Sequence, residues 1–310
     1  MNVLSLFDGM SCGQVALERA GIPIERYLAS EIDKYAIQVT QHNYPATEQL
    51  GDVCGVSAAA LPDIDLMMGG SPCQSLSIAN RQTESGLVQG KSILFWEFHR
   101  LLQEVSPKYF LLENVASMKN ADKDTISSAL GVEPITINSS LVSAQQRKRH
   151  YWTNIPNITQ PEDKGIYLKD ILETGYTEKL KSYCITATYA RACPQDCFNH
   201  SQRQMIFNKP VRVAKINKGG QGERIYSIDG KSISLSANSG GLGRTSGLYE
   251  IGEYVRRLTP VECERLQTVP DNYTDVDVTN AQRYKMLGNG WTVDVIVHIF
   301  GEIAEARLVA

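Results

Sequence analysis

Three groups of residues in this chain carry the side chains needed for nucleophilic and acid–base chemistry. In Ser71-Pro72-Cys73-Gln74 a thiol follows a proline, whose fixed φ angle stiffens the turn. Glu113-Asn114-Val115 offers a carboxyl group that, if partly buried, would carry a proton near neutral pH. In the run from Gln145 to His150, Arg147 and Arg149 project from one face of an extended chain and suit a phosphate, a base carbonyl or a carboxylate.

Two of these groups directly follow short apolar runs that indicate buried strands. The runs are 64–68, which is followed by two glycines that predict its end, and 109–112, which leads into Glu113. Because open α/β sheets place their chemistry at the carboxyl ends of the strands, we expect Cys73 and Glu113 to share one edge. The alternatives are a small buried thiol for Cys73 and an ordinary surface carboxylate for Glu113.

The first residues predict the opening unit of a nucleotide-binding type of sheet. A strand over 2–7 is followed by a glycine turn over 8–13 and a helix over 14–20. The turn is not G-x-G-x-x-G, so it favours an adenosine-bearing ligand other than a dinucleotide. Glu31 and Asp52 end the next two strands and suit ribose hydroxyls and an adenine amine, although each alone is also a common helix cap.

The remaining pattern supplies the frame for these residues. Residues 75–91 show little apolar periodicity, and a loop of this length predicts a lid over the site. Further helices are expected over 33–43, 92–105, 261–266 and within 281–308, and further strands over 26–30, 135–138, 211–216, 225–228 and 233–236.

Composition excludes several classes of protein. The chain has 310 residues, of which 42% are hydrophobic, and no apolar run approaches the roughly 18 residues of a membrane span. Its first residues lack a basic region and a cleavage site, so we expect no signal peptide, and its seven scattered cysteines suit a reducing compartment. Net charge is −3, yet residues 179–224 hold nine cations against two acids, which predicts a phosphate-facing surface or a solvated basic face. The spacing of Cys184, Cys193, Cys197 and His200 matches no zinc pattern, so we expect no metal.

Taken in order, the motifs resemble those of the cytosine-5 DNA methyltransferases. Phe7-Asp8-Gly9, Glu31, Asp52, the Pro-Cys turn, Glu-Asn-Val and Gln-x-Arg-x-Arg are followed by 257–267, which resembles the family's R-x-L-T-P-x-E motif, and by 288–290, which resembles its G-N-S motif. The resemblance spans residues 1 to about 305. It implies a bacterial or phage type of enzyme that uses S-adenosylmethionine.

The resemblance assigns roles to individual residues. Cys73 would add to carbon 6 of cytosine, Glu113 would serve ring nitrogen 3, and Arg149 or Arg147 would hold the carbonyl oxygen or pair with Glu113. The implied cofactor residues are Phe7, Asp8, Gly9, Gly13, Glu31, Ile32, Asp52, Val53, Pro72, Leu94, Asn289 and Trp291. The implied DNA-binding residues are Ser75, Arg81, Gln221, Arg224, Ser234 and Asn238.

The segment 218–241 resembles the target-recognition segment of the HhaI-type members. The chain departs from the pattern of the bacterial members at three places, namely the turn over 8–13 after Phe7, Asn238 and Gly290-Trp291. Asn238 stands where that type has an aromatic residue, and Trp291 stands where bacterial members usually have Val. The implied fold is a Rossmann-like mixed sheet with helices on both faces, plus a small, mostly β recognition domain. We expect a catalytic domain over 1–158, a target-recognition domain over 159–254 and a return to the catalytic domain over 255–310.

The implied reaction is methylation of carbon 5 of a flipped-out cytosine within a short specific sequence of double-stranded DNA. We expect a cytoplasmic, nucleoid-associated monomer with DNA as its partner, and a cognate restriction endonuclease as a candidate second partner. Two alternatives stay open, namely an RNA methyltransferase on the same scaffold and a catalytically silent DNA-binding relative. The recognition region with Gln221 and Arg224 favours a DNA methyltransferase over an RNA methyltransferase. The intact Cys73 and Glu113 favour an active DNA methyltransferase over a catalytically silent relative.

Overall fold

The computed structural model describes residues 1–72, 94–175, 177, 179–192, 204–207, 211–215, 224–227, 248–249 and 255–309. Its main strands are β1 (Asn2–Leu6), β2 (Arg26–Ser30), β3 (Glu48–Gln49), β4 (Leu66–Gly70), β5 (Tyr109–Val115), β6 (Ile135–Asn138) and β7 (Lys148–Thr153). They form one sheet in the order β3-β2-β1-β4-β5-β7-β6, in which only β7 runs antiparallel to its neighbours. The predicted mixed sheet is therefore confirmed.

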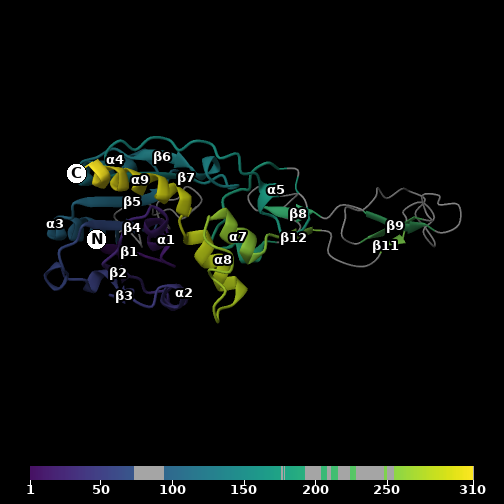
Figure 1. Cartoon of the computed structure of the whole chain (residues 1–310), viewed down its shortest axis with the longest axis horizontal. Helices are drawn as coiled ribbons and strands as arrows, with labels where there is room; N and C mark the ends of the chain where they lie inside the picture. The colour runs from purple at the N-terminus through teal and green to yellow at the C-terminus, as the bar shows by residue number, and fades with distance from the viewer. Residues whose placement is uncertain are drawn as a thin grey trace.

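Helices cover both faces of this sheet because alternate strand residues point to opposite sides. Val3, Leu66 and Leu111 face one core cluster, while Leu4, Met67 and Leu112 face the other. The first face is covered by α1 (Cys12–Arg19), α2 (Lys34–Asn43) and α9 (Val293–Val309), and the second by α3 (Phe95–Val105) and α4 (Asn120–Leu130). This arrangement agrees with the predicted layers (Figure 1).

The second half of the chain contributes short elements beyond the main sheet. These are α5 (Leu168–Ile171), α7 (Pro260–Leu266), α8 (Asn280–Asn289), β8 (Met205–Phe207), β9 (Val211–Lys215), β10 (Arg224–Ser227), β11 (Leu248–Tyr249) and β12 (Val255–Arg257). The short strands form two separate sheets, β11-β10-β9 and β12-β8. In Figure 1 the helices α7 and α8 lie between the main sheet and these strands. The domain boundaries at 158 and 254 stay a prediction.

Several elements differ from their predicted extent. Gly69 and Gly70 lie inside β4 instead of stopping it, and β5 continues through Glu113 and Asn114. Pairing explains both extensions, since Gly70 is opposite Glu113 on one side and Glu113 is opposite Tyr151 on the other. The C-terminal helical region is two helices, because Gly290 ends α8 in an extended conformation before α9 begins.

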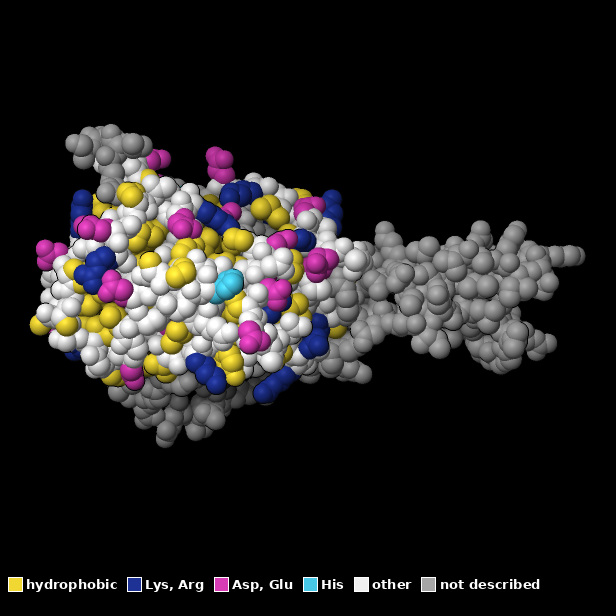
Figure 2. Space-filling view, turned by 60° about the horizontal axis from the view of Figure 1, so that its bottom comes forward, with side chains coloured by type: hydrophobic (Ala, Val, Ile, Leu, Met, Phe, Trp, Pro, Cys, Tyr) yellow, Lys and Arg dark blue, Asp and Glu magenta, His cyan; other side chains and the backbone are white. Residues whose placement is uncertain are grey.

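The described residues include no membrane-spanning helix, and the face drawn in Figure 2 shows no large field of one charge. Within the described residues, no helix combines the length and apolarity needed to cross a bilayer. On the face drawn in Figure 2, Lys and Arg side chains are interspersed with Asp and Glu over the described part of the molecule. Attraction for a polyanion would therefore have to come from a local surface instead of the whole body.

Candidate active site

A cavity of about 660 Å³ opens at the carboxyl ends of β1, β2, β4 and β5. The structure brings most of the predicted catalytic and cofactor residues to its wall: Phe7, Asp8, Gly9, Glu31, Ile32, Asp52, Val53, Pro72, Leu94, Glu113, Arg147, Arg149, Asn289 and Trp291. A volume of this size is typical of sites for small ligands. Residues that are more than 200 positions apart in the sequence thus line one cavity.

Some predicted residues cannot be placed against this wall. Cys73, Ser75, Arg81, Gln221, Ser234 and Asn238 lie outside the described residues, as do the expected lid over 75–91 and the strand over 233–236. Arg224 is the first residue of β10. Gly13 is described but does not line the cavity. It lies in the first turn of α1 and faces the core, where an added Cβ would lie 2.4 Å from Cε of Met68.

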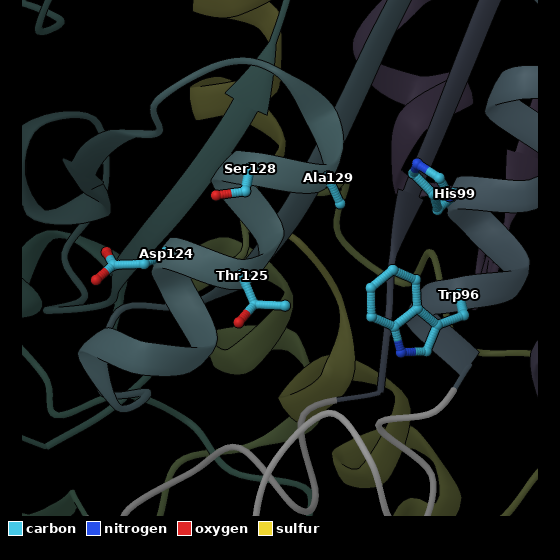
Figure 3. A pocket seen from close by; sticks show the side chains of 6 residues that line it. All are labelled: Trp96, His99, Asp124, Thr125, Ser128 and Ala129. Atoms are coloured by element: carbon cyan, nitrogen blue, oxygen red, sulfur yellow. The ribbon is translucent and has the colours of Figure 1, made fainter.

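A second hollow, of about 580 Å³, lies on the surface of α3 and α4 and contains none of the predicted site residues. Figure 3 shows its lining, which consists of Trp96, His99, Asp124, Thr125, Ser128 and Ala129. These helices cover the second face of the sheet, away from the strand ends that carry Glu31 and Glu113. The predicted chemistry therefore gathers in the first cavity.

The loop after β1 holds Glu31 in a fixed orientation. Phe7 and Gly9 have φ angles of 56° and 61°, and the backbone N–H of Gly9 donates to Oε2 of Glu31 at 2.8 Å. Oε1 of the same carboxylate accepts the backbone N–H groups of Ile32 and Asp33 at 2.7 and 2.8 Å. A bulky residue such as Phe7 rarely has a positive φ, and such strain concentrates at functional sites. Glu31 is thus preset at the rim of the cavity.

Apolar surface and a second carboxylate complete this end of the cavity. Ile32 is 73% exposed, which is unusual for a large aliphatic side chain. Asp52 caps a 3₁₀ turn, η1 (Val53–Gly55), by accepting the N–H of Cys54 at 3.0 Å. An exposed aliphatic face between two carboxylates suits a flat heterocycle joined to a sugar with hydroxyl groups.

Asp8 differs from these carboxylates because its oxygens turn toward buried hydroxyl groups. Oδ1 accepts from the hydroxyl of Tyr27 at 2.7 Å, and Oδ2 accepts from Ser11 Oγ. Burial raises the pKa of Asp8 to about 6, although hydrogen bonds from Ser11, Ser5 and Tyr27 oppose the rise. The hydrogen bonds of Asp8 to Tyr27 and Ser11 therefore hold the loop after β1 in place, and its neighbours Phe7 and Gly9 line the same cavity.

The carboxylate of Glu113 lies at the other end of the cavity and is held by two donors. Nε of Arg149 is 2.8 Å from its Oε1, and Nε1 of Trp291 is 3.2 Å from its Oε2. The side chains of Glu113 and Arg149 are only 10% and 14% exposed. Of the two roles proposed for the arginines, pairing with Glu113 belongs to Arg149.

Asn114 connects this carboxylate to the turn that carries the thiol. Its side-chain amide donates to the carbonyl oxygen of Ser71 at 3.2 Å and to Ser71 Oγ at 3.0 Å. Its own carbonyl oxygen accepts the N–H of Val115 at 2.8 Å. Asn114 is almost completely buried, so the residues just before Cys73 are tied to the strand of Glu113.

Arg147 has a different environment from Arg149, although both come from β7 or its approach. Its guanidinium is buried and donates to the carbonyl oxygens of Ile185, Gly288 and Gly290 at 3.3, 3.3 and 3.0 Å. These contacts anchor the end of α8, which carries Asn289 and precedes Trp291. Arg147 therefore supports the wall of the cavity more than it offers a charge to a ligand.

Cys184 lies between these two arginines. Its sulfur accepts from Nη1 of Arg147 at 3.2 Å and lies 3.9 Å from Nη2 of Arg149. Burial raises the pKa of the Cys184 thiol, but the two guanidiniums outweigh that effect, and the pKa lies below its ordinary value. The sequence favours a free thiol over a zinc ligand at Cys184 and does not predict its place between the two arginines.

Two further residues of the site escaped the sequence patterns. Gly70 leaves room for its neighbours, because an added Cβ would lie 2.9 Å from Nε1 of Trp291 and 3.1 Å from Oε2 of Glu113. Lys285 lines the cavity from α8, one helical turn before Asn289. That spacing of four residues places the two side chains on one face and is a signal that the sequence did offer.

Comparison with known proteins gives these features a context. A sequence model of the family described as C-5 cytosine-specific DNA methylase matches residues 1–305. The Type II methyltransferase M.HhaI of Haemophilus parahaemolyticus is 29% identical over 322 residues, covering 96% of this chain and 93% of that protein. The Type II methyltransferase M.NlaX of Neisseria lactamica is 28% identical over 311 residues, covering 95% and 93%. Among solved structures, the Entamoeba histolytica methyltransferase EhMeth shares the fold, with a TM-score of 0.69, 17% identity and coverage of 99% and 98%.

Proposed function

The chain belongs to the C-5 cytosine-specific DNA methylases, and from this premise we propose that it methylates carbon 5 of cytosine within a short specific sequence of double-stranded DNA. DNA cytosine-5 methyltransferase activity follows from the family. The base-flipping route, the covalent addition by Cys73 and the choice of a short duplex site are the proposal. The observation that supports it most directly is the Glu113–Arg149 pair beside the turn of Ser71 and Pro72.

The geometry supports a division of labour among three residues. Carbon 5 of cytosine is a weak nucleophile, so the ring must first be activated by addition of the Cys73 thiolate to carbon 6. The added electron pair moves toward ring nitrogen 3, where Glu113 delivers a proton. After carbon 5 has taken the methyl group, loss of its proton to a base re-forms the double bond between carbons 5 and 6 and releases the thiolate, and ring nitrogen 3 returns its proton to Glu113. Arg149 holds Glu113 in place throughout.

The cavity beside these residues fits S-adenosylmethionine, the methyl donor that the family uses. Glu31 would accept hydrogen bonds from the ribose, Asp52 would face the adenine amine, and Ile32 and Phe7 would pack on apolar surface. When bound, the sulfonium supplies an electrophilic methyl group. The fit rests on the exposed aliphatic surface and on the two carboxylates at consecutive strand ends.

In this proposal, the DNA is recognised by residues other than those that line the cavity. Because carbon 6 is shielded in a stacked duplex, the base must be extruded at a cost of a few kcal/mol. We assign Gln221 to the orphaned guanine and Arg224 to a neighbouring guanine, with Ser75, Arg81, Ser234 and Asn238 as further DNA contacts. The proposed setting is a bacterial cytoplasm, where the enzyme works as a monomer, either with a cognate endonuclease or as an orphan.

A single-turnover methylation assay with tritiated S-adenosylmethionine tests the substrate class. Duplex DNA, single-stranded DNA and tRNA are offered separately, and bisulfite sequencing of plasmid from expressing cells locates the modified cytosines. We expect label in duplex DNA at one short sequence. Label in tRNA alone would replace the proposal with the RNA alternative.

The covalent step has its own test. Cys73→Ser should bind the duplex but transfer no methyl group, and DNA containing 5-fluorocytosine should trap wild-type protein in a complex that resists denaturant. Cys54→Ser is the matched control, because Cys54 is an exposed thiol that does not line the cavity. Substantial turnover by Cys73→Ser would overturn the nucleophile assignment.

A further inference from the structure

Both carboxylate oxygens of Glu113 are occupied, and the two donors come from opposite sides of the site. Arg149 on β7 takes Oε1 at 2.8 Å, and Trp291, between α8 and α9, donates its indole N–H to Oε2 at 3.2 Å. The indole of Trp291 also lines the predicted cofactor cavity. One side chain therefore contacts the space for the methyl donor and the acid at the same time.

The surrounding chain is built to allow this contact. Gly70 lies opposite Glu113 in the sheet, and a Cβ there would approach Nε1 of Trp291 to 2.9 Å. The carbonyl oxygen of Gly290 accepts from Nη2 of Arg147 at 3.0 Å and from Nε2 of Gln267 at 3.2 Å. Thr292 donates to Oε1 of Gln267 at 2.9 Å, so the backbone is anchored on both sides of Trp291.

We propose that Trp291 is a positioning residue that fixes Oε2 of Glu113 through its indole N–H and links occupancy of the cofactor cavity to the protonation of this acid. The inference rests on the proposed role of Glu113 as the proton donor. An N–H donor stabilises the ionised carboxylate, because a carboxylate accepts at both oxygens. A ligand that packs against the indole changes this hydrogen bond, and by linkage the pH must then change the affinity for that ligand.

Other charges near Glu113 must be included in any pH argument. Arg149 pairs with it directly, Arg147 lies beside Arg149 with Cys184 between them, and Tyr151 lies opposite Glu113 on β7. Burial and the charge of Glu113 both raise the pKa of Tyr151, which therefore stays neutral near pH 7. Oε2 of Glu113 accepts the indole N–H of Trp291 at 3.2 Å.

The first experiment observes the indole directly and needs no turnover. The chain has three tryptophans, so a ¹H–¹⁵N spectrum shows three indole signals, and Trp291→Phe assigns one of them. We expect this signal to move with pH in the wild type, to lose that titration in Glu113→Gln and to shift when S-adenosylhomocysteine is added. A signal that ignores pH, Glu113→Gln and S-adenosylhomocysteine would overturn the proposal even if methylation of DNA is demonstrated.

The second experiment separates positioning from packing. Trp291→Phe keeps an aromatic ring but lacks the N–H donor that favours the ionised carboxylate, so the alkaline limb of the kcat–pH profile, where the proton donor Glu113 loses its proton, should move toward alkaline pH. The dependence of S-adenosylhomocysteine affinity on pH should weaken in the same variant. Trp96→Phe is the control, because Trp96 lies in the second hollow on α3 (Figure 3). If Trp291→Phe fails to fold, Gly70→Ala perturbs the same contact, and an unchanged profile in either folded variant contradicts the proposal.

Discussion

Lys285 on α8 forms an ion pair with Asp33, the N-cap residue of α2, with 2.6 Å between Nζ and Oδ2. The two residues lie 252 positions apart and both line the cavity. The pair therefore connects the C-terminal part of the chain, which carries Asn289 and Trp291, to the loop that presents Glu31. Burial raises the pKa of Asp33, but the hydrogen bond and charge of Lys285, together with the backbone N–H groups of Tyr35 and Ala36, outweigh burial, and the pKa lies below its usual range.

Because this pair spans the rim of the cavity, it should affect ligand affinity more than folding. We expect Lys285→Met to weaken binding of S-adenosylhomocysteine about fivefold, by isothermal titration calorimetry, with little change in the melting temperature. Arg26→Met is the matched control, because it breaks the exposed Arg26–Glu48 pair at the opposite end of β2. Equal losses of affinity in both variants would refute a specific role for the rim.

Substitution of Arg147, which directly precedes β7, and of Arg149, which lies in β7, should have different effects. Arg147→Met leaves the carbonyl oxygens of Ile185, Gly288 and Gly290 without their buried donor, so it should lower the free energy of unfolding by about 3 kcal/mol. Arg149→Met removes the partner of Glu113 and should reduce kcat at least about 100-fold. Urea unfolding and single-turnover rates, measured on both proteins, test this division. If folded Arg147→Met protein loses more of its single-turnover rate than folded Arg149→Met protein, the assignment of the two roles is wrong.

Asp8 predicts a specific pH dependence of stability. Its folded pKa of about 6 exceeds the ordinary value of 3.8, so between these values the native state binds more protons than the unfolded state. The contribution of Asp8 to stability should therefore be fully present below about pH 4, fall as the pH rises through about 6, and be smaller above that pH by on the order of 3 kcal/mol. Asp8→Asn keeps an acceptor for Tyr27 but has no charge to bury, so it should flatten this profile in urea unfolding experiments.

The exposed carboxylate of Asp63 provides the comparison for that measurement. Asp63→Asn removes one surface charge and should retain the slope of the wild type between about pH 4 and about pH 6. A profile for Asp8→Asn that matches the wild type would mean that the Asp8 carboxylate is not the group responsible.

Two glycines of the C-terminal helices should respond oppositely to the same substitution. A Cβ on Gly288 would lie 2.3 Å from the backbone of Thr186 and Ala187, which cannot rotate away, so Gly288→Ala should destabilise the protein by about 3 kcal/mol. Gly301 lies inside α9, and among the described residues no atom outside the helix lies within 4 Å of an added Cβ, so Gly301→Ala should stabilise the protein by about 0.5–1 kcal/mol. Differential scanning calorimetry reports both signs. A stable Gly288→Ala would show that the 186–187 segment can move.

The sequence by itself determined the frame and the identity of most wall residues. Alternating and continuous apolar runs predicted β1, β2 and β6 nearly residue by residue, because burial on one or both faces leaves a local pattern. The acids at strand ends, Glu31 and Asp52, were found for the same reason, since parallel strands bring their carboxyl ends to one edge. Ordered motifs then predicted the family that the comparisons confirm.

Only the tertiary structure decided which hydrogen-bond and ion-pair partners each charged side chain has. No local pattern distinguishes Arg147 from Arg149, which are two residues apart and have the same chemistry. One lies against the carbonyl oxygens of Gly288 and Gly290, and the other against Glu113, because distant segments pack on β7 differently at each position. The same holds for Trp291 and Gly70, whose contact depends on a close approach that a glycine inside β4 permits. Hydrogen-bond partners across long sequence separations depend on packing geometry, and a one-dimensional pattern does not record that geometry.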